Sequence, residues 1–441
     1  MTATLDTVGT STASRWIDTW DPENPALWAA SGKKIARRNL IFSILAEHIG
    51  FSVWTMWSSL VLFLGPRYGF SPADKFLLTS VPALVGSVLR LPYTFAVARF
   101  GGRTWTTVSA LLLLLPLAGM LVVLTPGVSL STLLVVAGLA GVGGGNFASS
   151  MTNINAFYPD RLKGRALGLN AGGGNLGVAA VQLVALLVLA TAGRSHPRYL
   201  VGAYLPLVVL AATLAWSRMD NLAGLRNDRH ALRDVCRSPH TWVMSLLYIG
   251  TFGSFIGFGF AFGQVLQVQF KAEFPTPLDA ASLTFLGPLV GSLVRPVGGV
   301  LADRLGGARV TAATFVGMAV AALAVLAASR QHSLTLYLCG FVALFTLSGI
   351  GNGSTYKMIP AIFRRTTDSP AEARRLAGAL IGIAGAIGAF GGVLVNVAFR
   401  QSFLTTGAAD GAYIAFLAFY VVCFLVTCLA YVRRGHRLSG V

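Results

Sequence analysis

Long apolar runs dominate this sequence and limit what it can fold into. Each run is about 20 residues long, the length of helix that spans the hydrocarbon core of a bilayer, and the short segments between the runs hold most of the charges. Hydrophobic residues make up 54% of the chain and charged residues 11%, which is too little polar surface for a soluble globule of 441 residues. The sequence therefore predicts an integral membrane protein and excludes a soluble enzyme built on one core.

Twelve membrane-spanning helices are predicted from these runs. We expect them at residues 40–64, 76–98, 104–124, 131–157, 165–190, 199–217, 241–269, 280–302, 308–328, 334–360, 376–399 and 411–432. The arginine-rich connector at 218–240 divides them six and six, which predicts an N-terminal half at 40–217 and a C-terminal half at 241–432. Residues 1–39 lack the charged start and the cleavage site of a removable signal, so we expect them to remain as a tail, with a second tail at 433–441.

The positions of lysine and arginine predict the orientation. With the N-terminus inside the cell, most of the 34 basic residues fall in cytoplasmic segments, so the positive-inside rule places both tails and the connector in the cytoplasm. A net charge of +18 also suggests nucleic acid, but the basic residues are spread over short loops rather than gathered in one patch. We expect a multi-pass protein of the cytoplasmic membrane, in contact with the lipid bilayer and with no nucleic-acid partner; nothing in the sequence requires more than a monomer.

The two halves of the sequence repeat one another. Arg90 precedes the glycine pair at Gly101 by eleven residues, and Arg295 precedes the pair at Gly306 by the same eleven. The fourth and tenth spans also correspond, since GVGGGNFASS matches GIGNGSTYKM. Two repeated six-helix halves are the plan of an alternating-access transporter, in which substrate binds near the midplane between the halves.

A turn between the eighth and ninth spans adds to this plan. The run GVLADRLGGAR, from Gly299 to Arg309, resembles the loop motif of the major facilitator superfamily, and its first-half counterpart from Ala96 to Arg103 lacks the aspartate. With the spans and the repeat, it predicts the fold of that superfamily: an all-α membrane protein with twelve transmembrane helices in two six-helix pseudo-repeats.

Two arginines inside the predicted spans are candidates for a functional site. Arg90 and Arg295 each lie about eleven residues from a membrane edge, where a charge costs roughly 2.5 to 3.5 kcal/mol. A guanidinium stays charged and offers planar, forked donors. Two of them facing each other would suit a small planar oxyanion such as nitrate or nitrite and, less well, a carboxylate or phosphate. The alternative is a structural pair, with buried acids as partners.

Two helical faces are candidates for the walls of a cavity. Polar residues on the fourth span recur at i, i+3, i+4 and i+7, on one face: Asn146, Ser149, Ser150 and Asn153. On the seventh span the recurring residues are Tyr248, Phe252 and Phe255. An aromatic wall would exclude water and strengthen the electrostatics of the arginines, although ordinary helix packing is the usual explanation of such a stripe. The stripe is therefore supporting evidence only.

Glycines form a third group, on the fourth, fifth and eleventh spans. Small residues give transmembrane helices smooth faces that can approach closely and slide as a cavity opens. We expect roles in helix packing and gating for Gly144, Gly145, Asn146, Gly172, Gly173, Gly174, Gly382 and Gly385. Static close packing is the alternative for any one of these glycines.

Four segments resemble the nitrate/nitrite porter family of the major facilitator superfamily: GGGNFASSMTNINAFYP, ALGLNAGGGNLG, SLLYIGTFGSFIGF and GIGNGSTYKMIP. The resemblance covers the chain from Trp20 onward and implies that Arg90 and Arg295 clamp the anion. It also implies substrate contacts from Phe147, Asn175, Tyr248, Phe252, Gly351 and Ser354. The eleventh span departs from the family because it has no asparagine before Asn396, so the asparagine role is carried over only to the fifth span.

That family contains both proton symporters and nitrate/nitrite exchangers, so the coupling has to be argued from residues. Glu47 lies well inside the first span, and Lys357 lies three residues beyond Ser354 on the tenth. The resemblance implies that both spans line the cavity, where this acid and this amine could pair and the carboxylate could carry a proton. We predict proton-coupled nitrate symport. The alternative for this acid and this amine is a fixed ion pair that locks two helices. The alternatives for the function are nitrate/nitrite exchange, which needs neither group, an anion channel, or a transporter of another solute.

Other kinds of chemistry have no candidate residues. The six histidines are dispersed, no metal-ligand spacing occurs, and the four cysteines fall in the connector or in apolar spans. The glycine runs follow no strand and lack the lysine and hydroxyl of a nucleotide-binding loop. We expect neither catalysis nor a cofactor.

Overall fold

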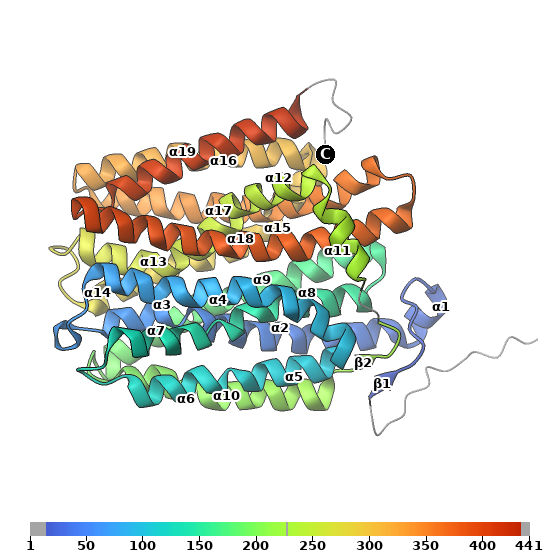
Figure 1. Ribbon diagram of the computed structural model, residues 1–441, viewed down its shortest axis with the longest axis horizontal. Helices are drawn as coiled ribbons and strands as arrows, with labels where there is room; N and C mark the ends of the chain where they lie inside the picture. Colours follow the sequence, from blue (N-terminus) through green and yellow to red (C-terminus); the bar gives the residue numbers. More distant parts are fainter. Residues whose placement is uncertain (1–14, 226–227, 434–441) are drawn as a thin grey trace, which may run out of the picture.

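The computed structural model describes residues 15–225 and 228–433, which form a bundle of long helices lying side by side (Figure 1). Within the described residues, twelve helical segments are long and apolar enough to cross a membrane. The predicted fold class, an all-α membrane protein with twelve transmembrane helices, is thus confirmed. Parts of the two predicted tails, residues 1–14 and 434–441, lie outside the described residues.

Each predicted span coincides with one of these segments, although several segments consist of consecutive helices. The first half contains α1 (Pro25–Leu27), η1 (Trp28–Gly32), α2 (Lys33–Thr55), α3 (Trp57–Phe63), α4 (Pro72–Phe100), α5 (Gly102–Leu112), α6 (Leu114–Val123), α7 (Leu130–Leu139), α8 (Val142–Phe157), α9 (Asp160–Thr191) and α10 (Pro197–Arg218). The second half contains α12 (Pro239–Tyr248), η3 (Ile249–Gly253), α13 (Ser254–Gln269), α14 (Pro277–Thr284), α15 (Leu286–Leu305), α16 (Gly307–Arg330), α17 (Leu334–Thr366), α18 (Pro370–Thr406), α19 (Asp410–Thr427) and η4 (Cys428–Val432). The shorter elements are β1 (Trp16–Ile17), η2 (Pro66–Tyr68), β2 (Asn221–Leu222) and, in the connector, α11 (Arg229–Cys236).

The first helical segment begins earlier than predicted, at Pro25 rather than near residue 40. The side-chain oxygen of Asn24 accepts hydrogen bonds from the backbone N–H groups of Ala26 and Leu27, which caps the helix. Proline is favoured in the first turn that follows such a cap. Because this cap and the buried Trp28 outweigh the polar composition, the second part of the predicted tail is helical.

The start of the described chain pairs with the connector. Strands β1 and β2 run parallel, and Asp220, just before β2, accepts hydrogen bonds from Arg38 (2.6 Å) and Asn39 (2.7 Å) on α2. Figure 1 shows β1, α1, α11 and the end of α19 at the same end of the bundle. This is the arrangement expected if both tails and the connector share one side of a membrane; which side that is stays a prediction.

Corresponding helix ends reveal the repeat within the chain. Ser71 and Thr276 each form a capping box with an aspartate three residues later, and a proline follows each of them in the first turn. The helices after these caps reach Gly101 and Gly306, whose φ angles of 86° and 90° lie in the region that favours glycine. The two glycines recognised from their spacing to Arg90 and Arg295 therefore make equivalent turns.

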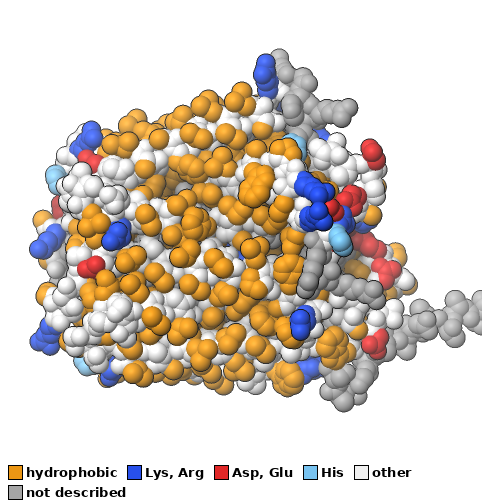
Figure 2. Space-filling view, in the orientation of Figure 1, with side chains coloured by type: hydrophobic (Ala, Val, Ile, Leu, Met, Phe, Trp, Pro, Cys, Tyr) orange, Lys and Arg blue, Asp and Glu red, His pale blue; other side chains and the backbone are white. Residues whose placement is uncertain are grey.

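The surface of the bundle is that of a membrane protein. Figure 2 shows hydrophobic side chains over the middle of this face, with the charged side chains gathered toward the two ends of the bundle. Large apolar side chains such as Val122, Val135 and Leu429 are mostly exposed. A soluble protein rarely exposes so much apolar surface, so this band is the part that faces lipid.

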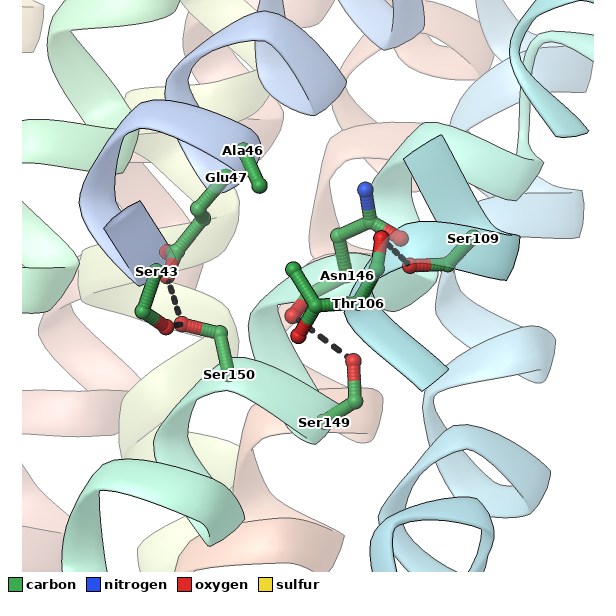
Figure 3. Close-up of a pocket in the computed structure, with 8 residues that line it drawn as sticks. All are labelled: Ser43, Ala46, Glu47, Thr106, Ser109, Asn146, Ser149 and Ser150. Carbon is green, nitrogen blue, oxygen red and sulfur yellow. Dashed lines mark hydrogen bonds between the residues drawn. The ribbon is translucent and has the colours of Figure 1, made fainter. Parts of the chain in front are cut away.

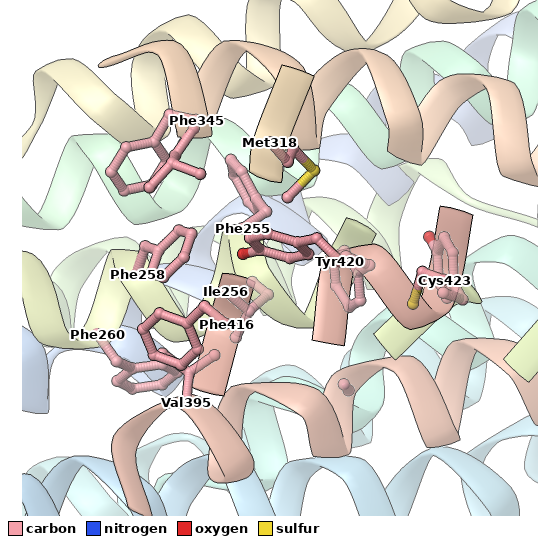
Figure 4. Packing of buried hydrophobic residues seen from close by; sticks show 14 of the residues in the cluster. Phe255, Ile256, Phe258, Phe260, Met318, Phe345, Val395, Phe416, Tyr420 and Cys423 are labelled. Atoms are coloured by element: carbon pink, nitrogen blue, oxygen red, sulfur yellow. The ribbon is translucent and has the colours of Figure 1, made fainter. Parts of the chain in front are cut away.

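Aromatic rings fill much of the interior of the C-terminal half. Phe258 meets Phe345 and Phe416 edge-on, with ring centroids 6.0 and 5.4 Å apart (Figure 4). Edge-to-face contacts of this kind stabilise aromatic pairs beyond the area that they bury. The rings from α13, α17 and α19 therefore hold these helices in a fixed packing.

In the N-terminal half, glycines allow the helices to pack closely. A Cβ atom on Gly144 would lie 2.8 Å from the Cα atom of Gly86 and 2.7 Å from the ring of Trp54. A Cβ atom on Gly145 would lie 2.8 Å from the ring of Tyr93. These two glycines have the close contacts that the packing prediction requires, because only a hydrogen side chain lets α8 approach α2 and α4 this closely.

We predict that Gly144→Ala destabilises the protein, because the added methyl group must displace the backbone of α4 or the ring of Trp54. Overpacking of this kind costs about 1–3 kcal/mol, and thermal unfolding of the purified protein should show a lower midpoint. The control is Gly202→Ala on α10, where no atom lies within 4 Å of the added Cβ. Equal midpoints for the two variants would contradict this account of α8 packing.

Candidate functional site

Arg90 on α4 is fully buried, with 0% of its surface exposed. Its Nε atom donates a hydrogen bond to the carbonyl of Gly144 (3.2 Å), and its Nη1 atom donates to the carbonyl of Gly385 (2.6 Å) on α18 of the other half. Its Nη2 atom has no hydrogen-bond partner. The side chain therefore joins the two halves and retains an unused donor group.

Arg295 on α15 is buried in a similar way, with 5% of its surface exposed. Its Nη2 atom donates to the hydroxyl of Tyr248 (3.2 Å), and its Nη1 atom has no partner. Neither this arginine nor Arg90 forms an ion pair with any acid in the described chain. The directly bonded acid partners that the alternative of a structural pair requires are therefore not found in the described chain.

One aromatic ring lies close to both arginines. The Cζ atoms of Arg90 and Arg295 lie 4.5 and 6.0 Å from the ring centroid of Phe147. Ring faces attract cations, and Phe252, stacked on Phe147 at 6.0 Å, lies 4.9 Å from Arg90. Tyr356 lies 5.7 Å from Arg295. The two guanidinium groups thus share one aromatic enclosure, to which both halves contribute.

Gly385 faces this enclosure rather than a packed helix. A Cβ atom built on it would make only ordinary contacts, 3.7 Å from Phe147, 3.8 Å from Nη1 of Arg90 and 3.9 Å from the hydroxyl of Tyr356. The prediction that Gly385 serves helix packing therefore needs correction. Its missing side chain leaves room beside Arg90, and its carbonyl binds that arginine.

The arrangement can hold a small anion. Arg90 and Arg295 are permanently charged groups in a desolvated site. Each has an unused N–H donor, and neither forms an ion pair in the described chain. The attraction between a guanidinium group and an anion is stronger in a site shielded from water than at an exposed surface. Planar donors beside flat rings favour a flat anion.

Two buried asparagines add unsatisfied polar groups. Neither side-chain amide atom of Asn175 on α9 or of Asn352 on α17 has a hydrogen-bond partner in the described chain. Buried amides without partners are rare, so both are available to a ligand or to water. Asn175 was among the predicted substrate contacts, whereas Asn352 was missed.

Gly351 and Ser354, also predicted as substrate contacts, serve packing in this structure. A Cβ atom on Gly351 would lie 2.6 Å from a methyl group of Thr251. The hydroxyl of Ser354 is hydrogen-bonded to that of Thr311 at 2.8 Å. These positions hold α17 against η3 and α16, which is a physical reason for small residues at both.

Glu47 and Lys357 do not pair, and this part of the prediction is wrong. The ammonium group of Lys357 lies 2.8 Å from both carboxylate oxygens of Asp303 in the loop motif. Glu47 on α2 is 1% exposed and accepts hydrogen bonds from Ser150 (2.5 Å) and Asn170 (2.7 Å). Lys357 has a long, flexible side chain that reaches the exposed end of α15, whereas the carboxylate of Glu47 stays inside the first half.

A small polar cavity lies beside Glu47 (Figure 3). Its volume is about 10 Å³, which is roughly the room that one water molecule needs. Its lining comes from α2, α5 and α8: Ser43, Ala46, Glu47, Thr106, Ser109, Asn146, Ser149 and Ser150. The polar face predicted on the fourth span thus lines a cavity through its first three members, while Asn153 instead packs against Gly102.

The remaining predicted glycines differ in their surroundings. Gly173 packs against Ile44, and Gly174 packs against the carboxylate of Glu47, so both are close-packed as predicted. A Cβ atom on Gly172 would have no neighbour within 4 Å, so close packing is wrong for it. Gly382 has only loose contacts, the nearest at 3.7 Å.

Tyr356 and Trp54 were not predicted, although both contribute to the enclosure. Tyr356 stands in the polar run GIGNGSTYKM of the tenth span, four residues and therefore one turn after Asn352. Trp54 lies 5.6 Å from Arg90 and donates to the carbonyl of Pro82 at 2.7 Å. The first could have been found from its spacing; the second gives no signal in the sequence beyond being an aromatic residue in a span.

Comparison with known proteins adds independent evidence. The family model described as Major Facilitator Superfamily matches residues 42–396. The chain is 38% identical to "Nitrate/nitrite transporter NarU" of Escherichia coli (strain K12), covering 94% of this chain and 96% of that protein. It is 36% identical to "Probable nitrate/nitrite antiporter NarK2" of Thermus thermophilus, covering 96% and 98%. Among solved structures, a D-xylose-proton symporter matches with a TM-score of 0.65 at 15% identity, over 90% of this chain and 97% of that one.

We predict that Gly385→Ala leaves folding unchanged but weakens anion binding. The methyl group meets no atom closer than 3.7 Å, yet it fills space beside Arg90. One methyl group in a pocket can change affinity by about 10-fold or more. The measurement is anion-dependent thermal stabilisation of the purified protein, with Gly378→Ala on the same helix as the control, since no atom lies within 4 Å of that site. Unchanged anion affinity in Gly385→Ala would place the anion elsewhere.

Proposed function

Because this chain belongs to the nitrate/nitrite porter family of the major facilitator superfamily, we propose that it carries nitrate, and also nitrite, across the cytoplasmic membrane by alternating access. It is a membrane transporter and not an enzyme. Relatives that share 36–38% of their residues with it over nearly their whole length are named for nitrate and nitrite, which supports the same cargo here.

The observation that carries this proposal is the pair of buried guanidinium groups without acid partners. Arg90 and Arg295 each keep one terminal nitrogen free, Nη2 and Nη1 respectively. Nitrate and nitrite are flat and singly charged, so each can accept in-plane hydrogen bonds from both groups while its face rests on Phe147. A tetrahedral phosphate or a substituted carboxylate cannot lie flat against the ring face of Phe147, so it fits this site less well.

The surrounding residues hold the clamp in shape. Tyr248 accepts a hydrogen bond from Arg295, and the carbonyls of Gly144 and Gly385 orient Arg90. In our proposal the anion binds Nη2 of Arg90, next to the hydrogen bond from Nη1 to the carbonyl of Gly385, so its arrival acts on a side chain that joins the two halves. Asn175 supplies a further amide.

We predict that Arg90→Lys and Arg295→Lys each reduce nitrate transport by about 10-fold or more. Lysine keeps the charge but loses the planar fork that binds an oxyanion with two donors. The measurement is nitrate uptake by purified protein in liposomes. The controls are Arg99→Lys and Arg304→Lys, near the exposed ends of the same two helices. Near-normal nitrate uptake by both test variants would show that nitrate is carried without an arginine clamp.

We further propose that transport is coupled to protons through Glu47. This carboxylate is buried, its Oε1 atom has no partner, and it lies within electrostatic reach of both Arg90 and Arg295. A bound anion offsets the charge of these two arginines, so anion and proton favour each other's binding, which is the requirement for symport. Lys357 has no part in this proposal because it is paired with Asp303.

We predict that an inward proton gradient accelerates nitrate uptake into liposomes and that Glu47→Gln abolishes this acceleration while nitrate exchange persists. Glutamine keeps the shape of the side chain but cannot gain or lose the proton. The control is Lys357→Gln, which should keep the acceleration. The alternative is nitrate/nitrite exchange, the activity named for the Thermus thermophilus relative. Uptake that ignores the proton gradient and requires nitrite inside the liposomes would establish that alternative instead.

A further inference from the structure

A groove of about 430 Å³ runs along the exposed face where the first helical segment passes from η1 into α2. The residues that matter for what it can hold are Ala30, Lys33, Lys34, Arg37, Ile41 and Phe42. The groove lies at the end of the bundle that carries β1 and the connector (Figure 1). It is remote in sequence and position from the arginine enclosure and is independent of the proposed transport.

The cations in this groove contrast with two paired cations at the same end of the bundle. Lys33, Lys34 and Arg37 are exposed and form no ion pair in the described chain. By contrast, Arg38 binds Asp220 and Lys357 binds Asp303. Because Arg37 follows Lys33 by one helical turn, the three charges lie on one side of the helix. They form a compact site of net charge +3 with no internal counter-ion.

Immediately beyond the cations, the surface becomes apolar. Ile41 is 49% exposed and stands one turn after Arg37, and Phe42 beside it is half-buried. One helical turn is about 5.4 Å, so the groove changes from cationic to apolar over that distance. This is the change that a phospholipid shows between its phosphate and the first part of its acyl chains.

The backbone that carries the groove is fixed in place. Trp28 is buried and packs edge-on against Tyr158, with centroids 5.8 Å apart. Trp20 donates a hydrogen bond to the carbonyl of Ala156 at 3.2 Å. The basic turn is therefore held against the end of α8 rather than left as a free polybasic tail, and a site of fixed shape can select a ligand.

We propose that this groove is a binding site for an anionic phospholipid. The phosphate of the headgroup lies among Lys33, Lys34 and Arg37, and the acyl chains run along Ile41 and Phe42. Basic groups at the membrane interface attract anionic headgroups, and a zwitterionic lipid offers them no net charge. A bound lipid holds the base of α2, the helix that carries Glu47.

The test compares lipid binding to the full-length protein by native mass spectrometry, with phosphatidylglycerol and phosphatidylcholine as probes. We expect phosphatidylglycerol adducts to be favoured by about tenfold or more, and the triple variant Lys33→Gln, Lys34→Gln, Arg37→Gln to lose this preference. The matched control removes three exposed charges elsewhere, Arg67→Gln, Arg198→Gln and Lys271→Gln, and should keep it.

Three results would overturn the proposal. Equal loss of preference in both triple variants would mean that the lipid responds only to overall charge. An unchanged preference in the first triple variant would place the lipid elsewhere. Glycerol phosphate, tested as a soluble competitor, should not displace the lipid, because it lacks the chains that contact Ile41; displacement at equal concentration would show a general phosphate site. Thermal unfolding of each variant is measured as a control. A midpoint close to that of the wild type shows that folded proteins are being compared.

Discussion

The structure depends on two guanidinium groups that are buried in the middle of a membrane protein and form no direct ion pair in the described chain. A buried charge is strongly unfavourable unless polar groups surround it. For Arg90 and Arg295 the compensation comes from two carbonyls, one phenol hydroxyl and the faces of aromatic rings. None of these carries a full negative charge, so the site retains a strong electrostatic preference for an anion.

This requirement explains why glycines surround the site. A carbonyl can reach a buried guanidinium only where the helix that bears it comes very close, and Gly144 permits that approach between α8 and α4. Gly385 differs, because a Cβ atom there would make only ordinary contacts with Phe147, Arg90 and Tyr356, and in our proposal the ligand lies beside it. The glycines of the two spans therefore differ in purpose, although they look alike in the sequence.

Bonds between the halves occur along the whole length of the bundle. At one end Arg374 on α18 binds Asp160 at the start of α9 at 2.5 Å. At the other end Gln264 on α13 donates to the carbonyl of Pro72 at 2.7 Å. Arg90 and Gly385 form a contact between these two ends. Alternating access requires each end to open in turn, and an anion that binds Nη2 of Arg90 acts on a side chain that takes part in this contact.

The sequence was sufficient for the features that depend on composition, period and spacing. The twelve spans follow from apolar length, and the equivalence of Arg90 and Arg295 follows from their equal distances to Gly101 and Gly306. What could not be predicted depends on rotation about the helix axis and on side-chain reach. The direction in which Gly385 points and the pairing of Lys357 with Asp303 both need three-dimensional contacts between helices that are distant in sequence.

The central claim is that a flat anion lies between two unneutralised arginines, and its most direct measurement is an experimental structure of the protein with nitrate bound. The account predicts planar density beside Phe147, within about 3 Å of Nη2 of Arg90 and Nη1 of Arg295. Nitrate bound away from both arginines, or guanidinium groups paired with acids in that structure, would contradict it.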